Sequence, residues 1–292
     1  MKRQRRIATW LGGTLGAVTA LVLFFGTAHA SDRVTEEFHQ VYSLSTEGRI
    51  ELENINGDVH ISGWDRNEVK VDAVKRAWSK ERLDGTKIQI DSTPNSLSIR
   101  TEYPNHNHTF WNDDRHDNPA SVEYTLTVPR HARLDEIKLV NGGLDVHDVG
   151  GEVRASCVNG RLDARNLQGR ASLSAVNGEL VASVERMPSS DLEFSAVNGS
   201  LRVTLPSDAK AELEASTVSG HISNDFGLPV SNHQFVGHSL RGELGGGGTR
   251  VHLSNVNGSI EIRRANDNRP LGPAKNLERE RKHDKDDDDD EI

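Results

Sequence analysis

Histidines and aspartates gather in one polar segment, at residues 104–119, and these residue types could bind a divalent metal. The segment contains His106, His108, Asp113, Asp114, His116 and Asp117. Imidazole nitrogens suit zinc or copper, and carboxylates suit calcium or magnesium. The spacing matches no fixed ligand signature, however, and a solvated polar loop is the ordinary meaning of such a run. We therefore expect no metal site; the weak candidates for one are His106, His108, Asp113 and His116.

Two aspartates, Asp145 and Asp163, could support catalysis by their spacing. They occupy the same position in two successive sequence repeats, which are described below. Glycoside hydrolases need converging carboxylates, and β-helix scaffolds are known to carry such enzymes. The equivalent positions of the other repeats break the acidic column, since they hold His60, Val181, Arg202, Ser223 and Glu261. We expect Asp145 and Asp163 to be exposed and solvated, and the protein not to be an enzyme.

Two further features have structural explanations. The run Gly245–Gly248 is not followed by Gly-Lys-Ser/Thr, so it predicts a tight turn and not a phosphate-binding loop. Cys157 is the only cysteine of the chain, which excludes an internal disulfide and a multi-cysteine zinc site. Because apolar residues surround it in the sequence, we expect a buried thiol. No cofactor is expected.

Composition limits the classes of partner. The chain has 292 residues, a formal net charge of −9 and only 5% aromatic residues. Nucleic-acid binding needs clustered Lys and Arg to neutralise phosphates, so an acidic chain argues against that class of partner.

A repeat organises the middle of the chain. The tripeptide Val/Ile-Asn-Gly recurs with asparagine and glycine at Asn56-Gly57, Asn141-Gly142, Asn159-Gly160, Asn177-Gly178, Asn198-Gly199 and Asn257-Gly258, and Val218-Ser219-Gly220 is a degenerate copy. From Gly142 to Gly220 the period is about 18–21 residues, and a fixed short period is the mark of a repeat architecture. Apolar residues alternate with polar ones after each glycine, as in Leu162/Ala164, which predicts strands with one buried face. Residues 48–78, 86–103 and 122–128 show the same alternation.

Two all-β architectures fit this pattern. Asn-Gly between alternating apolar residues is a strong hairpin signal and would give an antiparallel β-meander. In a single-stranded β-solenoid, each Val-Asn-Gly repeat would instead form one coil. Equivalent residues would then stack 4.7–4.9 Å apart, and asparagines could form hydrogen-bonded ladders. The solenoid explains why the same asparagine recurs, whereas a meander would tolerate other turn residues, so we favour the solenoid. Its narrow interior also explains the low aromatic content.

The same residues resemble a known family. The run from Gly57 to Asp65, the Val-Asn-Gly repeats and the closing Leu244–Gly248 with Asn257–Ile260 are similar to the DUF4097 family of β-strand-repeat proteins, which are described as adhesin-like. The resemblance covers roughly residues 35–264. It implies an envelope or surface role and supplies no catalytic motif.

The two ends of the chain differ from the repeats. Residues 1–30 combine four basic residues, an apolar run and the small-residue pattern Ala28-His29-Ala30, which is typical of a secretory signal peptide. An uncleaved membrane anchor is the alternative, since an apolar run of about 20 residues can span a bilayer. We expect a β-solenoid domain at residues 31–264 and a disordered acidic tail at residues 265–292, because like-charge runs cannot bury apolar surface.

These observations favour a non-enzymatic, adhesin-like binding protein exported to the periplasm or cell surface. Its partner would be an envelope protein or a glycan, with membrane contact only if the N-terminal segment is uncleaved. The first alternative is an envelope-stress or signalling accessory that acts through protein partners. The second is a carbohydrate-active enzyme on a β-helix scaffold.

Overall fold

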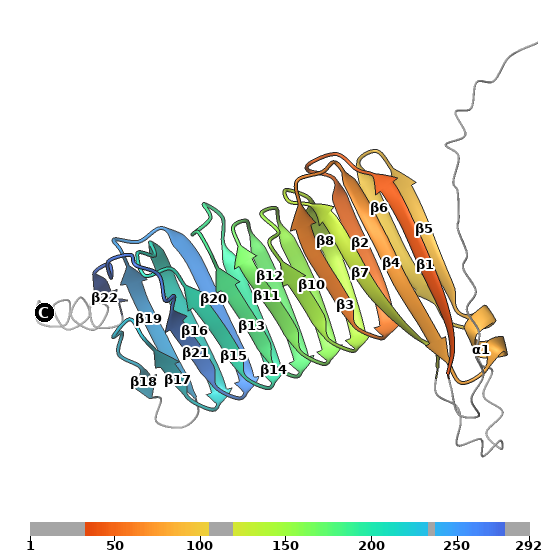
Figure 1. Ribbon diagram of the computed structural model, residues 1–292. Helices are drawn as coiled ribbons and strands as arrows, with labels where there is room; N and C mark the ends of the chain where they lie inside the picture. Colours follow the sequence, from red (N-terminus) through yellow and green to blue (C-terminus); the bar gives the residue numbers. More distant parts are fainter. Residues whose placement is uncertain (1–32, 105–118, 233–236, 278–292) are drawn as a thin grey trace, which may run out of the picture.

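The computed structural model describes residues 33–104, 119–232 and 237–277. In these residues the chain forms an elongated stack of two facing β-sheets (Figure 1). The predicted signal peptide lies outside the described residues. So do the metal candidates His106, His108, Asp113 and His116, and most of the acidic tail.

The first sheet, called sheet A, has ten strands in the described part of the chain. Their spatial order is β1 (Val34–Ser43), β4 (Glu68–Ala77), β7 (Ser121–Pro129), β3 (Val59–Trp64), β9 (Leu144–His147), β11 (Leu162–Leu167), β13 (Leu180–Val184), β15 (Leu201–Leu205), β21 (Ile260–Arg264) and β17 (Ile222–Asn224).

The second sheet, called sheet B, faces sheet A. Its spatial order is β18 (Ser231–Asn232), β19 (His238–Leu244), β16 (Ala211–Ser219), β20 (Thr249–Asn257), β14 (Leu192–Asn198), β12 (Ala171–Asn177), β10 (Val153–Asn159), β8 (Arg133–Asn141), β2 (Arg49–Asn56), β6 (Ser96–Glu102) and β5 (Lys87–Thr93). An additional strand, β22 (Ala274–Asn276), pairs with β19. A short helix, α1 (Lys80–Gly85), begins after the N-cap residue Ser79.

The repeats pair in parallel, which confirms the solenoid and shows that the antiparallel meander is wrong. Each repeat places one strand in sheet B and the next in sheet A, with the Asn-Gly pair at the corner between them. Equivalent residues pair across coils, as in Leu162↔Leu180 of sheet A and Ala175↔Ala196 of sheet B. One period of the sequence repeat therefore corresponds to one coil.

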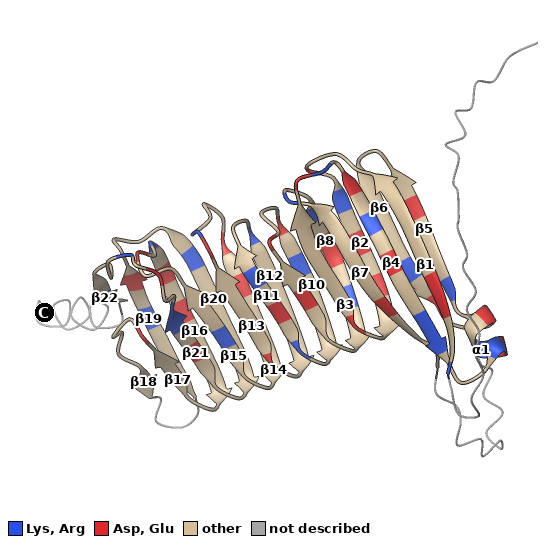
Figure 2. Ribbon diagram, in the orientation of Figure 1, with Lys and Arg blue, Asp and Glu red and all other residues tan. Residues whose placement is uncertain are grey.

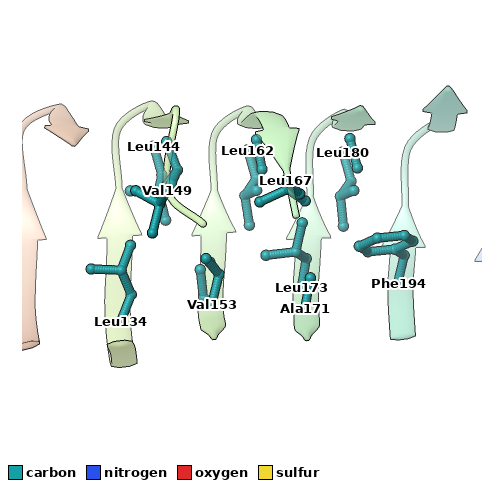
Figure 3. Close-up of a cluster of buried hydrophobic side chains, with 14 of the residues drawn as sticks. Leu134, Leu144, Val149, Val153, Leu162, Leu167, Ala171, Leu173, Leu180 and Phe194 are labelled. Atoms are coloured by element: carbon teal, nitrogen blue, oxygen red, sulfur yellow. The ribbon is translucent and has the colours of Figure 1, made fainter. Parts of the chain in front are cut away.

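The core lies between the two sheets. Alternate residues of each strand point inward, and Leu144, Leu162 and Leu180 of sheet A are fully buried against Leu173 and Phe194 of sheet B (Figure 3). Cys157 lies in the same column as Ala175 and Ala196 and is buried, as expected from its apolar neighbours. The inward positions accept mostly Val, Leu, Ile and Ala because the space between the sheets is narrow.

The coils do not stack in the order of the sequence at either end. The β20–β21 coil lies between the β14–β15 and β16–β17 coils, so the last repeat is inserted before the preceding one (Figure 1). At the other end, the β2–β3 coil lies between the β6–β7 and β8–β9 coils. The sequence predicts that residues 48–103 form the first coils, and β2, β3 and β6 do so. Strands β4 and β5 instead pair antiparallel with β7 and β6, and neither this pairing nor the interleaving is visible in the sequence.

Ordered structure extends beyond Arg264, where the sequence places the end of the folded domain. Strand β22 pairs antiparallel with β19, and the Gly245 amide donates to the Pro273 carbonyl at 2.8 Å. The predicted tail boundary at residue 265 is therefore too early. An edge strand can pair through its backbone alone, so residues 265–277 need no hydrophobic pattern. The same holds for β1 at the edge of sheet A, a polar strand that pairs with β4 although its sequence lacks a strong apolar pattern.

Candidate functional site

The repeated asparagines form one continuous ladder along a corner of the solenoid. In every coil after that of Asn56, the asparagine Nδ2 atom donates to the Oδ1 atom of the asparagine in the preceding coil of the stack, at distances between 2.8 and 3.0 Å. The ladder runs through Asn56, Asn141, Asn159, Asn177, Asn198 and Asn257. At its end, the Asn56 backbone amide donates to the Tyr103 hydroxyl at 3.2 Å, and burial raises the pKa of Tyr103 to about 12. The ladder fixes the register of the coils, because a slip would break every bond.

A column of apolar side chains lies beside the ladder on the outer face of sheet B. Its members are Ile55, Val140, Val158, Val176, Val197, Val256 and Val218. Several of them are exposed, from 36% for Val140 to 53% for Val218. Val158 and Val176, in the middle of the column, are partly buried. A row of β-branched side chains that is exposed at both ends of the ladder is a candidate interaction site, because contiguous exposed apolar patches mark such sites.

A column of serines adjoins the apolar column. Ser156, Ser174, Ser195, Ser254 and Ser216 pair in register across five neighbouring coils. Together, the five serines and Val158, Val176, Val197, Val256 and Val218 form what we call the Ser/Val face. These side chains are short and uncharged, and the strands beneath them are in register, so the face is regular and shallow. Sequence reasoning missed the serines, although Ser-x-Val precedes the Asn or Ser of each of these repeats.

Charged side chains border the Ser/Val face at the opposite corner. There the signs alternate from coil to coil, and Arg133 lies 3.3 Å from Glu152, which lies 3.9 Å from Arg170. Asp191 and Arg250 continue the alternation at 3.8 Å. Figure 2 shows Lys and Arg interspersed with Asp and Glu along the stack. Opposite charges in neighbouring strands stabilise their pairing, which explains this edge without a ligand.

The two candidate catalytic aspartates lie side by side on the outer face of sheet A but have different partners. Asp145 pairs with His60 at 2.9 Å. Asp163 is held by Arg161 at 2.8 Å and Arg165 at 2.7 Å, and its side chain is only 5% exposed. The prediction that both are solvated is therefore wrong for Asp163, because the two arginine side chains cover its carboxylate.

The pKa of Asp163 reflects this arrangement. Burial alone would raise the pKa of the carboxyl group, but hydrogen bonds and charges from Arg165 and Arg161 outweigh burial and lower it. A carboxylate with a lowered pKa, engaged by two guanidinium groups, is a poor general acid. The geometry is that of a structural ion-pair cluster.

Metal and thiol chemistry find little support in the described residues. Within residues 33–104, 119–232 and 237–277, no group of three or more His, Cys, Asp or Glu side chains could hold a metal ion. Burial raises the pKa of the Cys157 thiol to about 11, so the reactive thiolate is scarce at neutral pH. The run Gly245–Gly248 forms the turn between β19 and β20, with φ angles from +61° to +150°.

The comparison with solved structures matches the chain to several bacterial proteins over most of its length. A candidate cell adhesion protein from Clostridium sporogenes is 12% identical, with a TM-score of 0.47, and the match covers 79% of this chain and 100% of that chain. A candidate adhesin from Bacteroides fragilis is 10% identical, with a TM-score of 0.33 and coverage of 79% and 97%. A candidate lipid-binding protein from Parabacteroides distasonis is 11% identical, with a TM-score of 0.30 and coverage of 81% and 98%.

Within the described residues, no helix has the length and apolar character needed to cross a membrane.

Two further comparisons concern curated proteins and protein families. None of the curated proteins matches the chain. The model of the Toastrack family, DUF4097, matches residues 46–263, which include all six Asn-Gly corners and the strands that carry the Ser/Val face. The chain therefore belongs to the DUF4097 Toastrack family.

Proposed function

We propose that this protein is a non-enzymatic, adhesin-like binding protein of the cell envelope, exported to the periplasm or cell surface, and that the Ser/Val face is its binding surface. The observation that carries the proposal is the exposed apolar column beside the serine column on sheet B. When a partner covers such a surface, the free-energy cost of desolvation is small, since short hydroxyls and methyl groups cost less to bury than charges.

The regularity of the face favours an extended partner. Equivalent side chains repeat at the spacing of parallel strands, about 4.8 Å, over five coils. A glycan chain or an extended segment of an envelope protein could make the same contact several times along this length. The export signal predicted at residues 1–30 would deliver the protein to a compartment that holds both kinds of partner.

The alternative of a carbohydrate-active enzyme loses its main support. It relied on Asp145 and Asp163 as a carboxylate pair, and Asp163 is engaged by Arg161 and Arg165. An envelope-stress accessory acting through protein partners remains compatible with the Ser/Val face, and the test below includes protein partners.

The test places a charge at the centre of the Ser/Val face. Val176→Lys should weaken binding to isolated envelope fragments and to any ligand found on a glycan array by about tenfold or more, because a buried unpaired charge is costly. The matched control is Val181→Lys, which places the same charge on the outer face of sheet A, one corner further along the chain. Equal loss in both variants, or none in either, would show that the Ser/Val face is not the binding surface.

A further inference from the structure

A small cavity lies outside the Ser/Val face, at the end of the solenoid that holds the N-terminal strands. Its volume is about 200 Å³, and it is lined by Arg33, Asn56, Arg76, Ala77, Trp78, Pro119 and Ser121. These residues come from the position just before β1, the last residue of β2, the end of β4 and the start of β7 with the segment before it. The cavity is thus built from segments far apart in the sequence that the fold brings together.

The lining is rich in hydrogen-bond donors and, among the described residues, contains no carboxylate. Arg33 and Arg76 each carry a guanidinium with five N–H donors. One nitrogen of the Arg76 guanidinium forms an ion pair with Glu123 at 2.6 Å. This contact orients the guanidinium, and its other N–H groups remain as donors for a ligand. No carboxylate within residues 33–104, 119–232 and 237–277 forms an ion pair with Arg33. Asn56 and Ser121 add an amide and a hydroxyl group. In a chain with a net charge of −9, a cavity lined by two arginines favours an anion.

An aromatic wall gives the cavity a second kind of contact. Trp78 is 51% exposed, and the Arg33 guanidinium lies over its ring at 4.6 Å from the centroid. This cation–π contact holds Arg33 beside the cavity. The exposed part of the indole offers an apolar surface on which a sugar ring could pack, since tryptophan combines an apolar face with a polar edge.

The size of the cavity limits the ligand. Pockets for drug-sized molecules are about 300–1,000 Å³, so a cavity of about 200 Å³ suits a single ring. We propose that this cavity binds one acidic sugar residue, with its carboxylate or phosphate on Arg33 and Arg76 and its ring against Trp78. Guanidinium groups bind both kinds of oxyanion in a bidentate manner. The proposal concerns a site separate from the Ser/Val face and does not depend on the function proposed above.

The test is a titration of the purified protein with five probes. Binding of each probe is monitored through the NMR signal of the Trp78 indole N–H. D-Glucuronate and glucose 6-phosphate carry a ring and an anion, glucose carries only the ring, and acetate and inorganic phosphate carry only the anion. We expect at least one of the two acidic sugars to bind about tenfold or more tightly than glucose and the ringless anions, because charge-assisted hydrogen bonds and ring packing add. The acidic sugar that binds more tightly identifies the anion.

Two substitutions locate the site. Arg76→Gln should weaken binding of the acidic sugar about tenfold or more. The matched control is Arg241→Gln, since Arg241 is also a half-buried arginine paired with a glutamate, Glu214, but lies at the far end of the solenoid. Equal affinity in both variants would overturn the proposal, as would a silent Trp78 signal with every probe. Equal binding of acetate or phosphate and the acidic sugars would also overturn it, because the ring would then contribute nothing. Val176→Lys should leave this titration unchanged, which separates the two proposals.

Discussion

Gly160 follows a ladder asparagine and satisfies two separate constraints. Its φ angle is +152°, in the region that favours glycine. A Cβ atom at this position would lie 1.9 Å from the carbonyl oxygen of Gly142 in the preceding coil. The corners therefore stack backbone against backbone, and only glycine fits between them.

Gly160→Ala should accordingly destabilise the fold by about 2 kcal/mol or more, since strain and a backbone clash act together. Thermal or urea unfolding measures the effect. Gly143→Ala is the control, because its Cβ would lie 3.6 Å from the nearest atom, the Asp58 Oδ1, and its φ is not positive. A cost for Gly160→Ala no larger than that for Gly143→Ala would refute the stacking explanation.

Asp163 supports a prediction about pH. Its folded-state pKa is lowered by the arginine contacts, so it binds protons less readily than in the unfolded chain. Its stabilising effect is present above the unfolded pKa of about 3.9 and is lost as the pH falls through the lowered folded pKa.

Asp163→Asn should therefore destabilise the protein by about 1–2 kcal/mol at pH 7, and the difference from the wild type should shrink in acid. Urea unfolding at pH 7 and at the lowest pH where the protein stays folded measures this. Asp145→Asn should cost less at pH 7, because the Asp145 side chain is 34% exposed and solvent screens its pairing with His60. A pH-independent cost for Asp163→Asn would contradict the ion-pair explanation.

The asparagine ladder adds side-chain hydrogen bonds between neighbouring strands of sheet B, which otherwise pair through their backbones. An interior asparagine such as Asn177 donates to Asn159 and accepts from Asn198. Asn257, at the end of the ladder, donates to Asn198, and among the described residues its Oδ1 atom accepts no hydrogen bond.

The number of bonds predicts the size of the effect. Each neutral hydrogen bond contributes about 1 kcal/mol net, so Asn177→Ala should cost about 2 kcal/mol and Asn257→Ala about 1 kcal/mol. Chemical unfolding of both variants tests the ratio. If the two substitutions cost the same, the ladder acts only as a set of local turn residues.

Near each end of the solenoid, one coil is inserted between two coils that would otherwise be neighbours. The β20–β21 coil pairs with β14–β15 on one side and β16–β17 on the other. The stability of a repeat protein is roughly a sum over coils and their interfaces, so loss of this coil removes two interfaces at once.

Two truncations test the interleaving. A chain ending at Arg264 loses β22, which pairs only with β19 in the described residues, and should keep its fold with a modest decrease in melting temperature. A chain ending at Gly248 loses β20 and β21 and should expose residues 192–244 to proteolysis and hydrogen exchange. Protection of residues 192–244 in the shorter chain would show that the inserted coil is dispensable.

The repeat can be predicted from the amino-acid sequence, and most of the fold follows from it. The Val-Asn-Gly spacing, the alternation after each glycine and the low aromatic content lead to a parallel solenoid with Asn177 and its equivalents at a corner, because one repeat is long enough for one coil. The burial of Cys157 is equally predictable from its apolar neighbours. These features depend on local patterns that every coil repeats.

Two features are visible only in the tertiary structure: the order in which the coils stack, and which outward-facing side chains are covered by their neighbours. The β20–β21 coil pairs with its neighbours through the same Val-Asn-Gly pattern that any other coil would present, so the sequence cannot tell which coil lies next to it. Likewise, Asp163 and Asp145 look equivalent in the repeat, yet only Asp163 has arginines two positions away on both sides that fold over it. The cavity at Arg33, Arg76 and Trp78 joins segments that are distant in the sequence. Such contacts depend on which strands pair, and that is a property of the whole molecule.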